Sequence, residues 1–291
     1  TANKVSNKNE ISKTFSVLSN PEFLAEGTAI NDLENPDRVL IGGEDPEAIN
    51  ALVNIYLNWV PYEQIICTNL WSSELSKLAA NAFLAQRISS INSISAFCEA
   101  TGANIQEVAK AIGTDKRIGD QFLNAGPGFG GSCFKKDILN LVYLSNYFGL
   151  PEVANYWNQV VALNTWQQDR IYKIVLDKLF GTVGGKNIAI LGFSFKANTN
   201  DTRESPAIRI SIDLLEEGAH LSIFDPKVSF ERMEDDFEKF SFNNQGIWRV
   251  ANSIPDALKN VDAVIILTAW DEFFGLDWNY LSSLMRTPAW V

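Results

Sequence analysis

A long central stretch of helical periodicity is the feature that most constrains the fold. From Trp71 onwards apolar residues recur at the spacing of one helical face, and strand-forming residues are few. Two further helical patterns follow, one around Ile138 and one that starts at Pro151 and runs toward Phe180. We therefore predict a block of long helices in the middle of the chain, with short strand-like runs before and after it.

The segment before this block has the pattern of an α/β domain. Residues 14–18 and 38–41 have strand patterns, and the second run ends at Gly42-Gly43. Asp45-Pro46-Glu47 then supplies an N-cap, an N1 proline and a first-turn acid for a helix. We expect residues 1–68 to be the last part of a domain in which strands and helices alternate.

After the helical block the alternation of strands and helices returns. Residues 187–191 have a buried-strand pattern, Ser205-Pro206 caps the next helix, and Gly218 ends it. The alternation continues with a strand, a helix and a strand at 221–225, 255–260 and 263–268. This order predicts a parallel, doubly wound sheet. We place three domains at residues 1–68, 69–180 and 181–291.

Composition and charge narrow the classes of function. The chain of 291 residues is long enough for more than one domain, and its composition, 46% hydrophobic and 20% charged, is ordinary for a packed protein. The formal net charge of −11 argues against a nucleic-acid or anionic-membrane partner, because those ligands select basic surfaces. The longest apolar runs, such as 263–267, are shorter than the roughly 18 residues that a membrane-spanning helix needs. We expect neither kind of partner.

Cysteine usage points to the compartment. Cys67, Cys98 and Cys133 share no metal-like spacing, and no signal peptide is recognisable. We therefore expect a reducing, cytoplasmic location, with Cys67 and Cys98 as packing residues. His220 opens a strand and is the single histidine, which excludes a histidine-rich site, and no metal is predicted. The chain does not begin with Met and stops in a strand-like run at Trp290-Val291, so we expect both ends to be cuts.

A Gly-rich run before Cys133 is the most informative local feature. Residues 126–131 contain four glycines, whose missing Cβ lets a backbone approach a ligand closely. Cys133 follows at the predicted start of a helix, where free N–H groups and nearby Lys135 and Lys136 favour a thiolate. Cys133 is thus a candidate nucleophile. The alternative is a small apolar core residue after a structural turn.

Four other polar residues are candidates for catalysis. Asp137 lies one helical turn after the cysteine and could act as a base or hold a water, or it could only stabilise its helix. Lys77 and Asn81 share one helical face, where an ammonium could stabilise an oxyanion or pair with Glu74. Glu22 lies in a loop after a strand and is a candidate base or a surface acid.

The loop at 192–205 joins a strand to a helix in the C-terminal segment. Its polar composition is that of a loop that faces a ligand. It is not Gly-x-Gly-x-x-Gly, and that motif occurs nowhere in the chain. Dinucleotide binding by this segment alone is therefore not supported.

Four segments, taken in order, resemble the signature of the UDP-glucose 6-dehydrogenases in the UDP-glucose/GDP-mannose dehydrogenase family. They are Asn20-Pro21-Glu22-Phe23, Lys77-Leu78-Ala79-Ala80-Asn81, Gly128-Phe129-Gly130-Gly131-Ser132-Cys133 and Lys136-Asp137. The resemblance extends over nearly the whole chain, including residues 201–205. It implies that 1–68 are the remnant of a Rossmann-like NAD-binding domain, followed by a central helical dimerisation domain and a C-terminal UDP-sugar-binding α/β domain.

The activity implied by the resemblance is oxidation of UDP-glucose to UDP-glucuronate with two NAD⁺ and water. Cys133 would form a thiohemiacetal with the intermediate aldehyde and then a thioester, which water hydrolyses. Lys77 would stabilise oxyanions, and Asn81 and Asp137 would position water and protons. Glu22 would assist hydrolysis as an acid or base.

Matching positions also imply binding residues. NAD would contact Glu26, Lys136 and Arg203. The UDP-sugar would be held by eight residues, with Arg117 coming from a neighbouring subunit of a homo-oligomer: Phe23, Leu24, Arg117, Asn124, Phe129, Gly130, Phe195 and Lys196. The family's N-terminal strand with its Gly-rich turn, and a C-terminal strand with a substrate-binding Arg, are absent from this sequence. We therefore expect the chain not to turn over alone.

Two alternatives stay open. The same cysteine chemistry would serve a dehydrogenase for UDP-N-acetylmannosamine or GDP-mannose. A non-catalytic module that binds UDP-sugar and drives oligomerisation would keep the fold without oxidising anything. The presence of Cys133, Lys77, Asp137 and Glu22 argues against this second alternative for the parent protein, because a scaffold needs none of them.

Overall fold

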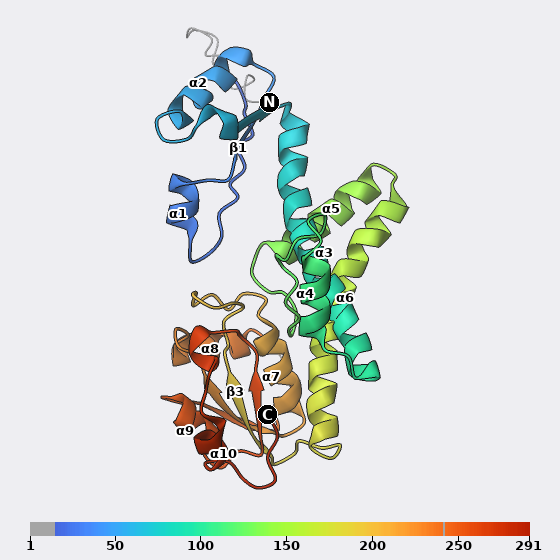
Figure 1. Ribbon diagram of the computed structural model, residues 1–291, viewed down its shortest axis with the longest axis vertical. Helices are drawn as coiled ribbons and strands as arrows, with labels where there is room; N and C mark the ends of the chain where they lie inside the picture. The colour runs from blue at the N-terminus through green and yellow to red at the C-terminus, as the bar shows by residue number, and fades with distance from the viewer. Residues whose placement is uncertain (1–14, 241) are drawn as a thin grey trace. The chain divides into compact units, whose positions relative to one another are not determined.

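A computed structural model describes residues 15–240 and 242–291 (Figure 1). The chain forms two compact units, which divide between Ala80 and Asn81 inside a single long helix, α3 (Leu70–Thr101). Each unit is built around its own parallel sheet. In the described part of the chain, no helix combines the length and the apolar character that crossing a membrane requires.

The first unit centres on two short parallel strands, β1 (Val39–Gly42) and β2 (Ile65–Thr68). Helix α2 (Pro46–Tyr56) connects them and begins as the sequence predicts, because the Asp45 carboxylate accepts hydrogen bonds from the N–H groups of Glu47 and Ala48. The short helix α1 (Ala29–Glu34) and a 3₁₀ turn at Tyr62–Gln64 complete the unit. Its small core consists of Val39, Ile41, Val53, Val60 and Ile65.

Two expectations about this unit are wrong. Thr14 lies outside the described residues, and 15–18 form no strand; Ser19 instead makes one isolated antiparallel bridge with Gly42. The side chains of Phe15 and Val17 are largely exposed, so they do not form the buried face that the alternating pattern predicts. Cys67, expected to be a packing residue, is exposed because in β2 only the first residue, Ile65, is buried.

The second unit starts with a block of helices, as the periodicity predicts. The remainder of α3 is followed by α4 (Ile105–Gly113), α5 (Phe134–Tyr147) and α6 (Pro151–Lys178), and α5 packs along α6. Their shared core contains Ala82, Ala85, Ile138, Leu141, Trp157 and Val160, together with the ring of Phe129 from the loop before α5. The small side chains of Ala82 and Ala85 are fully buried, which lets the neighbouring elements approach α3 closely.

The rest of this unit is a four-stranded, all-parallel sheet in the order β5-β4-β3-β6, which confirms the predicted doubly wound sheet. The strands are β3 (Asn187–Leu191), β4 (His220–Phe224), β5 (Ile247–Val250) and β6 (Ala263–Ile266). The helices are α7 (Pro206–Glu216), α8 (Phe230–Glu238), α9 (Ile254–Leu258) and α10 (Trp278–Ser282). Ser205 caps α7 as predicted. The strand-like run at the end of the sequence makes a parallel bridge from Trp290 to β6.

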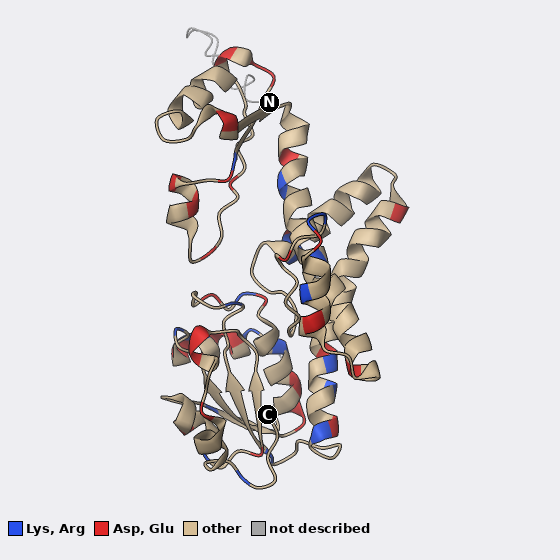
Figure 2. Ribbon diagram, in the orientation of Figure 1, with Lys and Arg blue, Asp and Glu red and all other residues tan. Residues whose placement is uncertain are grey.

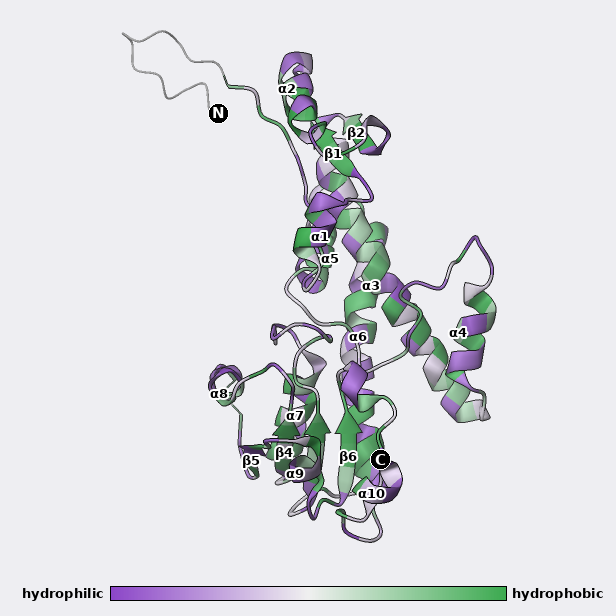
Figure 3. Cartoon of the chain, turned by 60° about the vertical axis from the view of Figure 1, so that its left-hand side comes forward, coloured by the Kyte–Doolittle hydropathy of each residue, from purple (hydrophilic) through white to green (hydrophobic). Residues whose placement is uncertain are grey.

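Both faces of this sheet are covered. Ile188 and Ile190 of β3 join one apolar core with α7 and the last turns of α6, while Ala189 and Leu191 join another with α9 and α10. A strand buried on both faces needs an unbroken apolar run, which explains the pattern at 187–191. In Figure 2 the strands of this sheet carry few charges, and in Figure 3 β6, a neighbour of β3, is hydrophobic, whereas the edge strand β5, which contains Arg249, is more polar. The shared core also fixes α6 against the sheet, and with it the loop that α6 supports.

Candidate active site

The Gly-rich loop and the 192–205 loop lie against each other in the second unit. The N–H of Gly131 donates to the carbonyl of Arg203 at 2.8 Å. A Cβ on Gly130 would lie 2.6 Å from the Glu204 carbonyl oxygen and 2.7 Å from Cβ of Phe195, so glycine is needed there for close approach. Lys135 and Glu204 add an ion pair of 2.8 Å between the two segments. The structure thus brings together two loops that the sequence analysis identified as separate ligand-facing segments.

Cys133 stands at the N-terminus of α5, as predicted. It is exposed, so the alternative of a buried core residue is wrong. Its carbonyl accepts the first helical hydrogen bond, from the N–H of Asp137 at 2.9 Å, and its Sγ lies 3.6 Å from Ser132 Oγ. The N–H groups of the first helical turn have no partner within a helix, and they favour negative charge at this point.

Asp137 and Asn81 form a buried pair behind the cysteine. Both residues are buried, and Asn81 Nδ2 donates to Asp137 Oδ2 at 2.6 Å. Lys136 Nζ lies 4.0 Å from the other carboxylate oxygen, with most of its side chain exposed. Asp137 thus lies in the first turn of α5 and is also oriented by a specific amide from α3, as a buried carboxylate requires.

Lys77 and Glu22 form a second pair, within the first unit. Lys77 Nζ donates to the Glu22 carboxylate at 2.7 Å and to the Glu22 backbone carbonyl at 2.6 Å. The sequence alternative, a pair with Glu74 on the same helix, is not the ion pair that forms. The Lys77 side chain is 20% exposed and that of Glu22 is 62% exposed. The ammonium is thus held close to a carboxylate that reaches water.

The loop that carries Glu22 is anchored through Asn20 and Phe23 of its own segment by Tyr56 and Arg38, which the sequence did not single out for the site. Asn20 Nδ2 donates to the Leu40 carbonyl at 2.8 Å, and the Tyr56 hydroxyl donates to Asn20 Oδ1 at 2.7 Å. The Arg38 guanidinium lies over the Phe23 ring, 3.8 Å from its centroid. Glu22, Phe23 and Leu24 line a cavity of about 400 Å³ in this unit. Glu26 lies in the same loop, two residues beyond Leu24.

The remaining proposed residues lie at several places in the second unit. Arg117 is exposed and bonded to Asp115, which lowers the pKa of that carboxyl, and Asn124 is exposed in the loop that follows. Lys196 Nζ lies 5.9 Å from the centroid of the neighbouring Phe195 ring. Arg203 pairs with Asp201 at 2.6 Å. In the described ranges no group of three His, Cys, Asp or Glu residues could hold a metal ion.

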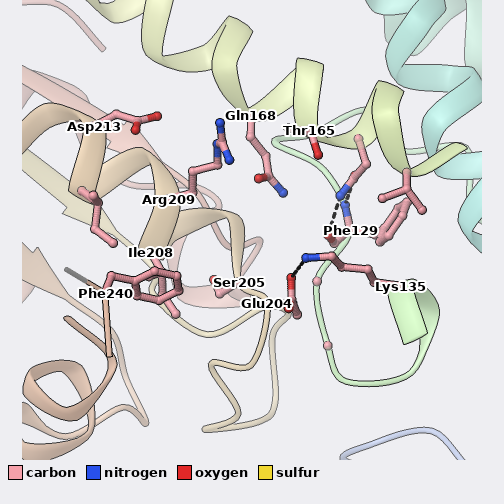
Figure 4. A pocket seen from close by; sticks show the side chains of 15 residues that line it. Phe129, Lys135, Thr165, Gln168, Glu204, Ser205, Ile208, Arg209, Asp213 and Phe240 are labelled. Atoms are coloured by element: carbon pink, nitrogen blue, oxygen red, sulfur yellow. Dashed lines mark hydrogen bonds and ion pairs between the residues drawn. The ribbon is translucent and has the colours of Figure 1, made fainter. Parts of the chain in front are cut away.

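A cavity of about 340 Å³ lies between the Gly-rich loop, α6 and α7 (Figure 4). Figure 4 shows the Lys135–Glu204 pair on the side of the loop, Thr165 and Gln168 extending from α6, and Asp213 on α7. Burial raises the pKa of Asp213 to about 6, against the opposing effect of Arg209. Of the proposed substrate residues, Phe129 and Gly130 line this cavity.

Comparison with known protein families covers most of the chain. Residues 1–60 match the NAD binding domain, residues 71–166 the central domain and residues 189–291 the UDP binding domain of the UDP-glucose/GDP-mannose dehydrogenase family. The chain belongs to this family. The three matches follow the same order along the chain as the two strand-containing segments and the helical block between them.

Relatives within the dehydrogenase family agree with this assignment. The chain is 55% identical to UDP-glucose 6-dehydrogenase 1 of Arabidopsis thaliana, over 95% of this chain and 61% of that protein. It is 57% identical to UDP-glucose 6-dehydrogenase of Gallus gallus, over 94% of this chain and 57% of that protein. A solved UDP-glucose dehydrogenase from Pyrobaculum islandicum superimposes with a TM-score of 0.81 at 34% identity, over 91% of this chain and 58% of that one. The chain therefore spans about 60% of the length of these relatives.

Proposed function

We propose that the protein to which this chain belongs oxidises UDP-glucose to UDP-glucuronate with NAD⁺, and that this chain supplies the nucleophile. One observation carries the proposal: Cys133 is exposed at a helix N-terminus, with the buried Asp137–Asn81 pair one turn behind it. The family assignment supports the substrate class, because residues 189–291 match the UDP binding domain. The names of the most similar curated relatives support UDP-glucose as the sugar nucleotide.

Cys133 acts as a covalent nucleophile on C6 of the sugar in this proposal. Its thiolate adds to the C6 aldehyde to give a thiohemiacetal, and loss of a hydride from C6 leaves a thioester. Water then breaks the carbon–sulfur bond, which releases the carboxylate and regenerates the thiol. Two NAD⁺ bound in succession would each accept one hydride, the first in forming the aldehyde and the second in forming the thioester. The sugar thus loses four electrons, and the water supplies the second carboxylate oxygen.

The two polar pairs handle charge and protons. Lys77 is proposed to stabilise the negative oxygen of each addition step, because an ammonium held against Glu22 is positioned before the charge develops. Glu22 assists hydrolysis as an acid or base, since most of its side chain is open to water. Asp137 and Asn81 are proposed to orient the attacking water and its protons, because each fixes the other at 2.6 Å.

Binding residues are proposed from matching positions. The UDP-sugar is held by Phe23, Leu24, Arg117, Asn124, Phe129, Gly130, Phe195 and Lys196, with Arg117 reaching a neighbouring subunit. Glu26, Lys136 and Arg203 face NAD, and the exposed ammonium of Lys136 suits a phosphate group. Because the sequence contains no Gly-x-Gly-x-x-Gly turn, these residues would hold only part of the dinucleotide. We therefore propose that this chain alone does not turn over.

Assembly and location are proposed with the same reasoning. The long α3 helix, with alanines and serines along it, is a candidate seam for a homo-oligomer through the central helical domain. The family's substrates are small metabolites, and the cysteine must stay reduced to react. Both points favour the cytoplasm.

The test follows NADH formation by the full-length protein with UDP-glucose. We expect two NADH per sugar for the wild type and for Cys67→Ala, which removes another exposed cysteine far from α5 in the sequence. Cys133→Ala should fail to form UDP-glucuronate. If the wild type does not oxidise UDP-glucose but oxidises UDP-N-acetylmannosamine or GDP-mannose, the substrate is that other sugar nucleotide. Binding of UDP-sugar without oxidation of any of them would instead establish the non-catalytic module.

A further inference from the structure

The main chain of the Gly-rich loop is bonded at two positions by buried side-chain amides. The N–H of Gly126 donates to Asn92 Oδ1 at 2.9 Å, and the carbonyl of Gly126 accepts from Gln167 Nε2 at 2.9 Å. The N–H of Phe129 donates to Asn164 Oδ1 at 2.8 Å, and the carbonyl of Phe129 accepts from Asn164 Nδ2 at 3.0 Å. Each of the two residues thus has its main-chain donor and its acceptor bound by amides. We name Asn92, Asn164 and Gln167 the amide clamp.

The amide clamp is buried. Asn92 is 1% exposed, Asn164 7% and Gln167 2%. If the loop moved away, the amide groups that bond it would lose these partners while still buried, which is unfavourable. Gln167 is itself oriented, because its Oε1 accepts from Arg170 Nη1 at 3.1 Å and Arg170 pairs with Glu99. This bond directs Nε2 toward the loop. Since α3 supplies one clamp residue and α6 supplies two, the loop is fixed to two long helices.

Gly128 shows how closely the clamp and the loop fit. It lies between the two bonded residues with φ of 123°, a conformation that side chains other than glycine rarely adopt. A Cβ at this position would lie 2.7 Å from Asn164 Oδ1. The loop can therefore follow this path only while a glycine leaves room for Asn164.

We propose that Asn92, Asn164 and Gln167 are positioning residues that set the orientation of Cys133 through the Gly-rich loop. The inference rests on the proposed function of Cys133 and extends it to residues that the proposed catalytic and binding roles do not include. Phe129 lies four residues before Cys133, and Gly131 between them is bonded to the Arg203 carbonyl. Within the described residues the Cys133 side chain makes no capping hydrogen bond of its own. The contact of its Sγ with Ser132 Oγ comes from the neighbouring residue of the same segment, so the main chain that the amide clamp holds carries both partners.

The principal variant is Asn164→Asp in the full-length protein. The carboxylate keeps an acceptor for the Phe129 N–H but loses the donor to the Phe129 carbonyl and repels that oxygen. We expect kcat for UDP-glucose to fall by on the order of 10²-fold with a smaller change in KM, as for a reacting group displaced by about 1 Å. Hydrogen exchange of the Gly126 and Phe129 amides should speed up in the same variant. Gln167→Met, which nearly keeps the volume, serves if the charged variant does not fold, and the same changes are expected.

Two matched controls separate positioning from general stability. Ser89→Ala removes a buried hydrogen bond of 3.0 Å from Ser89 Oγ on α3 to the Val160 carbonyl on α6, without touching the loop. Asn158→Asp makes the same substitution at an exposed position of α6. Both should keep wild-type kcat and wild-type exchange of the loop amides, even where Ser89→Ala lowers the melting temperature.

Failure of the clamp proposal can be distinguished from failure of the proposed function. Hydrogen exchange reports the loop without turnover, so a wild type that does not oxidise UDP-glucose would refute the activity and leave the clamp measurable. The proposal is overturned if Asn164→Asp and Gln167→Met lower the melting temperature as Ser89→Ala does while kcat and loop exchange stay at wild-type values.

Discussion

Replacing Gly130 by alanine should disturb the contact between the two loops of the candidate site. The added Cβ would lie 2.6 Å from the Glu204 carbonyl oxygen and 2.7 Å from Cβ of Phe195. Neither neighbour is the flexible end of a side chain, so a segment must move by several tenths of an ångström. Glu204 already has a φ of 53°, which restricts how its main chain can adjust. We expect a loss of about 1–3 kcal/mol in the free energy of unfolding, as for other overpacked sites.

The assay is thermal unfolding of the full-length protein, with UDP-glucose binding measured by calorimetry on the same samples. Gly126→Ala is the matched control, because a Cβ there meets nothing within 4 Å and its φ is not positive. Gly130→Ala should melt several degrees lower than Gly126→Ala and bind UDP-glucose more weakly. Equal melting temperatures and equal affinities for the two variants would refute the close-approach argument.

Three further outcomes follow from two carboxyl groups and from one loop. Asp213→Asn should gain stability relative to wild type as pH rises from about 4 to 6 and stay level above, as melting temperatures across that range can show. The reason is that a carboxyl whose pKa is raised to about 6 disfavours the folded state once it ionises. Asp137→Ala should cost about 1–3 kcal/mol in denaturant unfolding because it leaves the buried amide of Asn81 unpaired; a loss no larger than that of an exposed Asp→Ala change would contradict this. Arg87→Lys should speed proteolysis of the loop before Asn124 with unchanged cleavage elsewhere, since the guanidinium bonds three main-chain carbonyls of that loop, those of Ile118, Gly119 and Gln121.

Local signals in the sequence were sufficient for most of the second unit. Ser205-Pro206 begins α7, and the apolar run at 187–191 forms a central strand. Both can be predicted because a helix cap and a strand buried on both faces each require particular residue types within a short segment. Strand β5 (Ile247–Val250) was not predicted. It is an edge strand with no fully buried residue, and it contains Arg249, so it has no continuous apolar run. An edge strand forms because β4 offers it a partner, which the sequence of 247–250 does not show.

In the candidate site too, features set by neighbouring residues could be predicted and features set by residues distant in sequence could not. The place of Cys133 at a helix start follows from neighbouring residues, and the structure has it there. The partner of Lys77 does not, because Glu22 lies 55 residues away and the helix offered Glu74 as a nearer acid. The amide clamp was missed for a related reason: Asn92, Asn164 and Gln167 satisfy a loop distant in sequence. The signal that could have found them is an amide in an otherwise apolar helical stripe.

The covalent role of Cys133 is the central claim, and trapping the intermediate tests it most directly. Full-length Glu22→Gln protein, in which thioester hydrolysis should be slowed, is mixed with UDP-glucose and NAD⁺, quenched in acid and digested for mass spectrometry. We expect a UDP-glucuronyl adduct on the peptide that contains Cys133 and no adduct on the peptide that contains Cys67. Formation of UDP-glucuronate at the wild-type rate by Cys133→Ala, or an adduct on another residue, would contradict the account.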